Sequence, residues 1–158
     1  MGIEMRELTQ LEMADLGRRK AQFNSFFEER MPVLTDFIER LELPNAPMVL
    51  VEANTFMPAL SQYMESQQID GEDRTWILTR IGYFIGEWLV QRYGGCWYLN
   101  EVPDTRYFLR YVVGRFSGIP NQNAMIDPFS IAELFVDSPC PRSLVNMLAD
   151  VDSELTSS

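Results

Sequence analysis

The chain has 158 residues, of which 46% are apolar and 12% aromatic, a composition that excludes an intrinsically disordered protein. Its length suits one domain with a sizeable core. The formal net charge is −10, from 23 acidic and 13 basic residues, which argues against nonspecific binding to nucleic acid or to anionic membranes. Such a charge suits a protein whose partner is basic.

The acidity belongs to the N-terminal half: residues 1–73 hold 14 acidic and 6 basic side chains, whereas residues 74–158 hold 9 and 7. The chain has no histidine and only two cysteines, Cys96 and Cys140, so catalytic triads built on histidine are excluded and a zinc site is disfavoured. The sequence also lacks a glycine-rich phosphate loop. We therefore predict no catalytic residues, no metal and no cofactor.

The first ten residues, MGIEMRELTQ, lack the apolar core of a secretory signal. Arg6 stands where a myristoylation signal has Ser or Thr. No segment of the sequence is long and uncharged enough to span a bilayer. These features predict a cytoplasmic protein that binds neither membrane nor nucleic acid.

Residues 8–30 are expected to form one or two helices, beginning at a capping box made by Thr9 and Glu12. Pro32 can occupy the first position of a further helix, which continues the apolar periodicity. The segment at residues 43–47, Leu-Pro-Asn-Ala-Pro, then breaks the chain.

Another helix is expected over residues 48–67, with a bend at Pro58, because proline removes a backbone donor and crowds the preceding turn. An acidic turn at residues 70–73 leads into the most apolar segment of the chain, which predicts a helix over about residues 72–93. Apolar side chains cover most of the circumference of this helix, so we expect it to be buried at the centre of the fold.

Two pairs of glycines mark this central helix. Gly82 and Gly86 lie four residues apart on one face, although glycine inside a helix costs about 1 kcal/mol relative to alanine. We infer that another element packs unusually close to them. Gly94 and Gly95 provide the left-handed stop that commonly ends a helix.

Glu87 is the residue of the central helix with the greatest functional interest. At about 100° per residue, Arg80, Tyr83, Glu87 and Gln91 share roughly one third of the helix circumference. Two interpretations stay open at this point. In the first, these residues form a narrow solvated stripe, because isolated carboxylates on helices usually face water. In the second, Glu87 is held at the mouth of a cleft.

After Gly95 the sequence becomes rich in aromatic and β-branched residues, which is typical of strands. Residues 96–101 and 106–113 are predicted to pair as a β-hairpin spanning residues 96–113. Residues 124–126 are predicted to add a third short strand.

Asp127 and Pro128 predict a cap followed by proline in the first turn of a helix. A last helix is expected over about residues 142–151, before a frayed polar tail that begins near residue 150. The C-terminal helices together would occupy about residues 128–151.

These elements predict an α+β fold that is mostly helical. A small two- or three-stranded antiparallel sheet, at about residues 96–126, is expected to pack on the central buried helix, at about residues 72–93. We treat residues 1–158 as a single domain, in which a helical N-terminal part (1–93) precedes the hairpin and the C-terminal helices. The predicted structural residues are Gly82, Gly86, Gly94, Gly95 and Pro128.

The chain resembles a family of small uncharacterised bacterial domains through three motifs: G-x-x-x-G-E at residues 82–87, G-G-x-W at residues 94–97 and D-P-F at residues 127–129. In that family, a Gly-Glu helix ends in a glycine pair and an aromatic strand, and a short Pro-Phe helix follows. The resemblance covers about residues 74–140 and implies no particular activity. Some domains of this type are similar to immunity or accessory proteins of bacterial toxin systems.

The leading hypothesis is a non-enzymatic protein-interaction domain, which binds a basic partner through its acidic helices or through the aromatic hairpin. The hairpin aromatics would then form a recognition surface, or they could simply cover the helical body. The runner-up is a small-ligand-binding domain or a carboxylate-based hydrolase with Glu87 in a cleft. A homodimer joined at the hairpin edge is a further alternative. The candidate binding residues are Glu87, Tyr83, Trp97, Tyr107, Arg110 and Tyr111.

Overall fold

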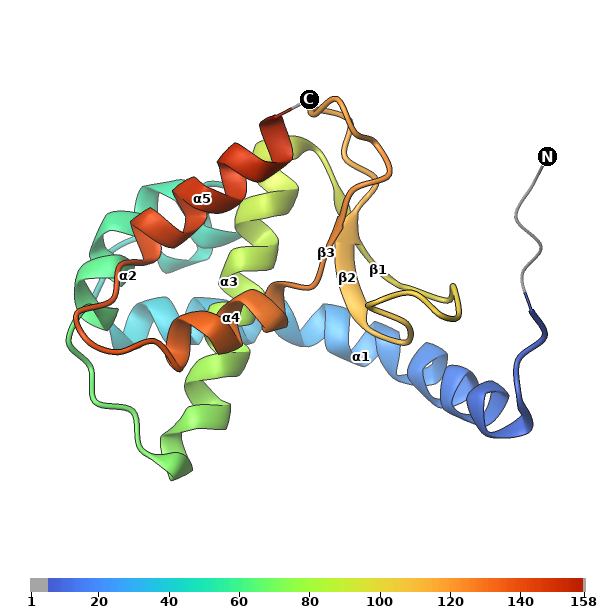
Figure 1. The fold of residues 1–158 in the computed structure, drawn as a ribbon. Coiled ribbons are helices and arrows are strands. Elements are labelled where there is room, and N and C mark those ends of the chain that lie inside the picture. The colour runs from blue at the N-terminus through green and yellow to red at the C-terminus, as the bar shows by residue number, and fades with distance from the viewer. Residues whose placement is uncertain (1–5, 158) are drawn as a thin grey trace.

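In the computed structural model, which describes residues 6–157, α3 (Gly71–Tyr93) runs through the middle of the molecule (Figure 1). α1 (Gln10–Arg40) crosses it on one side and α4 (Pro128–Val136) crosses it on another. α2 (Met57–Met64) and α5 (Leu144–Thr156) pack together beside it, and a three-stranded antiparallel sheet packs against α3 and α1. The arrangement confirms the predicted α+β fold, mostly helical with a small sheet.

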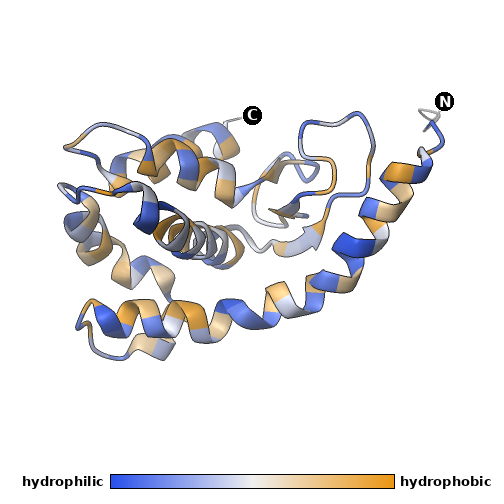
Figure 2. Ribbon diagram, turned by 90° about the horizontal axis from the view of Figure 1, so that it is seen from below, coloured by the Kyte–Doolittle hydropathy of each residue, from blue (hydrophilic) through white to orange (hydrophobic). Residues whose placement is uncertain are grey.

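α1 is one continuous helix of 31 residues, whereas the sequence predicts a new helix at Pro32. Its capping box is confirmed: the Thr9 hydroxyl accepts from the Glu12 N–H at 3.1 Å, and the Glu12 carboxylate accepts from the Thr9 N–H at 2.9 Å. Pro32 and Glu28 are both exposed, so the Glu28 carbonyl, which loses its helical donor, can be hydrated. Figure 2 shows α1 along one side of the molecule, with its N-terminal half extending past the other helices.

The segment between α1 and α2 is less regular than predicted. Instead of one helix over residues 48–67, it contains two short 3₁₀-helices, η1 (Ala46–Leu50) and η2 (Ala53–Phe56), followed by α2. Pro58 lies in the first turn of α2, where its missing N–H has no helical partner to lose. The proline therefore begins a helix here and does not bend one.

α3 begins and ends within one residue of its predicted bounds, 72–93. Asp70 caps the first turn by accepting from the Asp73 N–H at 3.0 Å. Gly94 ends the helix in the predicted left-handed conformation, with a φ of 71°. The sequence therefore defines this element through its local start and stop signals.

The predicted close approach at the helical glycines is confirmed. A Cβ atom at Gly82 would overlap the ring of Phe129, at the start of α4, and one at Gly86 would overlap the indole of Trp97 in the sheet. At Gly95, a Cβ atom would lie 2.6 Å from the ring of Phe116. Glycine at positions 82 and 86 lets α4 and the sheet pack directly on the backbone of α3.

The sheet has the strand order β1 (Cys96–Leu99), β2 (Tyr111–Gly114), β3 (Met125–Ile126), and all neighbours are antiparallel. Trp97 lies opposite Val113 in the register of the first pair. The three strands confirm the sheet that the sequence predicts at about residues 96–126, although each is shorter than expected.

The second strand starts only at Tyr111, and not at residue 106 as predicted. Leu109 has a φ of 64°, a left-handed conformation that ends extended structure. Asn100, which is 1% exposed, organises the loop: its carbonyl accepts from the Leu109 N–H at 2.9 Å, and its N–H donates to the Arg110 carbonyl at 3.0 Å. Residues 106–110 therefore form a turn around the Asn100 backbone.

α4 starts as predicted, because the Asp127 carboxylate accepts from the Phe129 N–H at 2.9 Å and Pro128 occupies the first turn. α5 differs from its prediction, since it continues to Thr156 and the expected frayed tail from residue 150 is mostly helical. Its last turns have tertiary contacts that local sequence does not reveal.

Two contacts hold the end of α5 in place. Leu155 is buried, and the Tyr93 hydroxyl at the end of α3 donates to the Asp152 carboxylate. Asp152 also lies 3.3 Å from the Nε of Arg92. The end of α5 is thus fixed against the end of α3.

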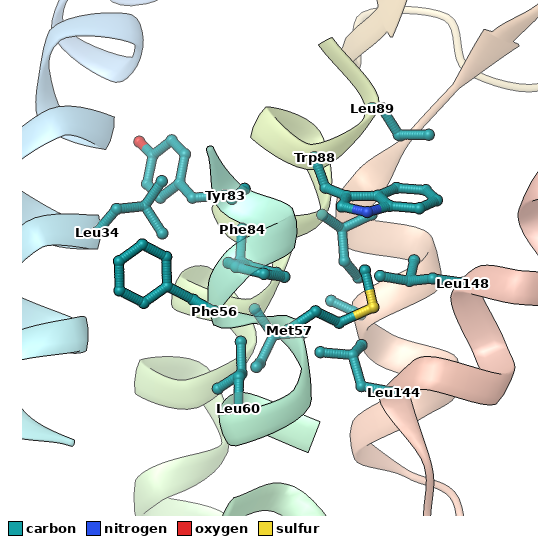
Figure 3. Close-up of a cluster of buried hydrophobic side chains, with 14 of the residues drawn as sticks. Leu34, Phe56, Met57, Leu60, Tyr83, Phe84, Trp88, Leu89, Leu144 and Leu148 are labelled. Carbon is teal, nitrogen blue, oxygen red and sulfur yellow. The ribbon is translucent and has the colours of Figure 1, made fainter. Parts of the chain in front are cut away.

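The hydrophobic core surrounds α3, in which every residue from 81 to 89 is buried. Figure 3 shows Phe84 and Trp88 of α3 among side chains of α2 and α5, such as Leu60 and Leu144. The predicted burial of the central helix is confirmed for this part. Within residues 6–157, the helices fall short of the length and apolar character that a membrane crossing requires.

Candidate functional site

α1 covers the face of α3 on which Tyr83 and Glu87 lie. The Tyr83 hydroxyl donates to the Phe26 carbonyl of α1 at 2.8 Å. Glu87 is 4% exposed and pairs with Arg30 of α1, with 2.8 Å between Oε1 and Nε. The indole N–H of Trp97 donates to the same carboxylate oxygen at 3.2 Å. Burial raises the pKa of Glu87, and the charge of Arg30 opposes that shift.

Of the two interpretations left open for this face, the solvated stripe is therefore wrong for Tyr83 and Glu87. Tyr83 and Glu87 are buried because a helix from far away in the sequence lies on them, and helical periodicity does not show which face a distant element covers. Gln91 is also used within the fold: it accepts from the Ala53 N–H at 2.7 Å and donates to the Val49 carbonyl at 3.0 Å. Glu87 joins α1, α3 and β1.

A cleft of about 290 Å³ opens beside Tyr83, between α1, α3, β2 and the start of α4. We call it the arginine cleft. It brings together three predicted binding residues, Tyr83, Arg110 and Tyr111, with Arg19, which is not among the predicted ones. Glu87 is not one of its lining residues. The cleft is lined by Arg19, Phe26, Thr79, Tyr83, Arg110, Tyr111, Asp127 and Phe129.

The arginine cleft has an excess of positive charge. The guanidinium of Arg19 lies 3.8 Å from the centre of the Tyr111 ring, and the Tyr111 hydroxyl donates to the Arg19 carbonyl at 2.7 Å. Arg110 Nη1 lies 3.3 Å from Asp127 Oδ2, and Asp127 is 1% exposed. Two guanidinium groups and one carboxylate thus meet in one cleft of an acidic protein.

The other predicted binding residues lie elsewhere. Trp97 is buried against Gly86, and Tyr107 lines a separate groove of about 590 Å³ between β3, α4 and α5. Tyr98 and Phe108 are half-buried. The hairpin aromatics therefore do not form one exposed surface, and Trp97 covers the helical body.

A second concave region, of about 460 Å³, lies where the chain passes from α2 to α3. We call it the α2–α3 pocket. Trp76 is 38% exposed and Tyr63 is 40% exposed, with the exposed carboxylates of Glu72 and Asp73 beside them. The pocket is lined by Tyr63, Met64, Gln67, Gln68, Ile69, Glu72, Asp73, Trp76 and Ile77.

The sequence contains a pattern that points to this pocket, although the residues of that pattern are predicted to have other roles. Trp76 is predicted to share the burial of the central helix, and the acidic turn is predicted only to start that helix. However, Glu72 and Asp73 precede Trp76 by four and three residues, so the three side chains share one helix face. An aromatic residue one turn after an acidic pair could have indicated an exposed recognition site.

Among residues 6–157, no three side chains of the metal-binding types lie close enough together to hold a metal ion. Cys96 and Cys140 are exposed free thiols. Comparison of the chain with protein-family models, with curated proteins and with solved structures finds no match. Functional proposals therefore rest on the geometry of the arginine cleft and the α2–α3 pocket.

Proposed function

We propose that the chain is a non-enzymatic protein-interaction domain that binds a basic partner through the α2–α3 pocket. The observation that carries this proposal is the exposure of Trp76 and Tyr63 next to two carboxylates. Tryptophan and tyrosine are enriched among the residues that dominate binding energy at protein interfaces. Aromatic side chains of this size, exposed together in one concavity, are suited to contact a partner.

Trp76 is held in position before any partner binds. The Arg80 guanidinium lies 4.0 Å from the centre of its ring, and the Phe37 ring meets it edge-on at 5.8 Å. A side chain that is already ordered loses less conformational entropy on binding than a mobile one. This favours Trp76 as the anchor of an interface.

The charge around the pocket selects the partner. Glu72 and Asp73 line the pocket, and Asp70, two residues before Glu72, is exposed. Arg74, the nearest cation in the sequence, is occupied by Asp137, with its Nε and Nη2 at 2.9 and 2.8 Å from the carboxylate oxygens. Glu72 and Asp73 are thus the charged residues that line the pocket, although Arg80 lies on the Trp76 ring, and the pocket fits a Lys or Arg side chain flanked by apolar residues.

The wider role that we propose is an immunity or accessory protein of a bacterial toxin system, supported by the acidic charge and by the resemblance to small bacterial domains. The alternative hydrolase gains no support from Glu87, which is 4% exposed and whose carboxylate is bound by Arg30 and Trp97. The homodimer alternative is tested separately by sedimentation at micromolar concentration.

An array of short peptides tests the proposal if the numbers of basic and apolar residues are varied independently. We expect binding to require both kinds of residue. Trp76→Ala should weaken the best peptide about thirtyfold, the effect of losing a hot spot of about 2 kcal/mol. Tyr63→Ala should weaken it less, and thermal melts would show that both variants fold.

A matched pair of charge variants shows whether the site is local. Glu72→Gln with Asp73→Asn should weaken peptide binding about tenfold, through two lost charge contacts. Glu7→Gln with Glu28→Gln removes the same charge from two exposed positions, one before α1 and one in its middle, and should change binding less than about twofold, because distant surface charges are screened. Equal effects from the two pairs would contradict a site in the pocket, as would an array without any binding peptide.

A further inference from the structure

The arginine cleft contains a cation that the fold does not neutralise. Within residues 6–157, Arg19 forms no ion pair with a carboxylate. Its Nε donates to the Leu109 carbonyl at 2.9 Å, and its terminal nitrogens have no partner in this part of the chain. Arg19 is thus fixed by one bond and retains donors for a ligand.

Arg110 is the second cation of the cleft. It pairs with Asp127, whose carboxylate also accepts hydrogen bonds from other groups. Asp127 Oδ1 accepts from the Phe129 N–H at 2.9 Å, and Oδ2 accepts from the Ser130 hydroxyl at 3.0 Å. The contact with Arg110 is longer, at 3.3 Å, and the Arg110 side chain is 56% exposed. Arg110 can therefore turn toward a ligand while the Asp127 carboxylate keeps its hydrogen bonds to Phe129 and Ser130.

The backbone of the hairpin loop places both cations at the same cleft. Leu109 adopts a left-handed conformation that bulky residues rarely adopt, with a φ of 64°. Its N–H is bound by the carbonyl of Asn100, and its own carbonyl binds Arg19. This conformation brings Arg19, from α1, and Arg110, from the loop, to one opening.

Apart from Thr79 and the Asp127 carboxylate, the remaining walls of the cleft are aromatic, and their hydroxyl groups are already used as donors within the fold, since Thr79 donates to the Thr75 carbonyl at 2.9 Å. The Tyr83 and Tyr111 hydroxyls both donate to carbonyls of α1, at 2.8 and 2.7 Å. The rings of Phe26 and Phe129 complete the lining. An anionic group would therefore be bound by the guanidinium groups, and an apolar ring would pack on the aromatic side chains.

We infer that the arginine cleft binds a small aromatic carboxylate, whose charged group pairs with Arg19 and Arg110. Guanidinium groups bind carboxylates in a forked, charge-assisted geometry, which suits this anion. The volume of about 290 Å³ lies just below the range of small-molecule sites, roughly 300–1,000 Å³, so the ligand is small. This site is separate from the α2–α3 pocket and does not depend on peptide binding there.

An NMR titration with benzoate tests the inference on the full chain. We expect the side-chain Nε–H signals of Arg19 and Arg110 to shift together and to saturate. Inorganic phosphate, which lacks the ring, and benzyl alcohol, which lacks the charge, should each bind at least about tenfold more weakly than benzoate. Equal binding of either probe would overturn the inference.

Variants of two neighbouring arginines locate the site. Arg110→Gln should weaken benzoate binding about tenfold, and Arg110→Lys, which keeps the charge without the fork, should weaken it less. Arg106→Gln removes the same charge from an exposed residue outside the cleft and should leave binding unchanged. If Arg106→Gln weakens binding as much as Arg110→Gln, or if benzoate shifts neither cleft arginine, the inference is overturned. Thermal melts of each variant confirm folding.

Discussion

α1 and β1 cover one face of α3 with polar contacts set among aromatic rings, whereas α2 and the first turns of α5 cover another face mainly with apolar side chains. On the first face, Tyr83 and Glu87 bind groups of α1 and the indole N–H of Trp97. On the second face, Phe84 packs among residues such as Leu60 of α2 (Figure 3). Both faces are buried, but the contacts that hold them differ in kind.

This difference indicates that the burial of a helix face and the position of the helix that covers it are set by separate interactions. Hydrogen bonds and ion pairs are directional, so they fix where α1 lies along α3. Apolar contacts depend mainly on volume and tolerate exchange of side-chain shape. The arginine cleft borders the polar face, where the positions of its residues are well defined.

The α2–α3 pocket arises where α3 is less covered by other elements. α2 ends at Met64, so the first turns of α3 extend beyond the apolar layer and residues 71–76 are mostly exposed. Trp76 is therefore left partly uncovered, although Phe37 of α1 meets its ring edge-on, whereas Phe84, two turns later, is buried. A narrow, charged cleft thus borders the polar face, and a wider aromatic pocket lies at the start of α3, beyond the end of α2.

Loss of the ion pair between Glu87 and Arg30 on the polar face should have the largest effect on the stability of the fold. We expect Glu87→Ala to lower the free energy of unfolding by about 3 kcal/mol, because Arg30 would stay largely buried without its counter-ion. Replacing both partners with apolar residues of similar size, Arg30→Met with Glu87→Leu, should recover most of this loss. Urea unfolding of Arg30→Met, of Glu87→Leu and of the variant that carries both, analysed as a double-mutant cycle, measures the coupling.

A conservative exchange on the apolar face is the matched control. Leu60→Met keeps the side-chain volume and removes no polar partner, so it should cost less than about 1.5 kcal/mol. If Leu60→Met costs as much as Glu87→Ala, the contrast between the two faces is refuted. Additive effects of the Glu87 and Arg30 variants would refute it as well.

Two glycine-to-alanine exchanges, one in α3 and one in α1, should change the stability of the fold by smaller amounts and in opposite directions. Gly86→Ala should destabilise the fold by about 1–2 kcal/mol, because overpacking against the buried Trp97 indole exceeds the gain of about 1 kcal/mol in helix propensity. Gly17→Ala, at an exposed position of α1 with open space around it, should stabilise the fold by about 1 kcal/mol. Thermal unfolding of both variants measures the signs, and stabilisation by Gly86→Ala would contradict the close packing.

Local signals explain which parts of the fold could be predicted from the sequence. The bounds of α3 depend on the Asp70 cap and on Gly94, and the start of α4 depends on the Asp127 cap, so neighbouring residues are enough to define them. The spacing of Gly82 and Gly86 also predicts a close contact, although not which ring fills the space. These features require no knowledge of distant contacts.

The burial of Glu87 and the set of residues that line the arginine cleft depend on contacts between segments far apart in the sequence. Arg19 meets Leu109, a residue ninety positions away, only because the loop around Asn100 takes a left-handed backbone conformation. Tyr83, Arg110 and Tyr111 were predicted as binding residues without any indication that Arg19 joins them. The pairing of α1 with the hairpin loop is a long-range event, so periodicity along either segment does not reveal it.

The smallest predicted effect concerns pH and the exposed start of α1. Arg6 binds Glu12, and together with the Thr9 cap it lowers the pKa of Glu12 from 4.5 to about 2. A carboxyl group with a lowered pKa stabilises the fold above its unfolded value, so this contribution is lost as the pH falls from about 4.5 through about 2. Urea midpoints should therefore be lower for Glu12→Gln than for the original chain at pH 7, and the difference should shrink towards pH 2. Glu7→Gln removes the same charge nearby without touching the capping box, and a similar trend in that variant would contradict a specific contribution of the capping box.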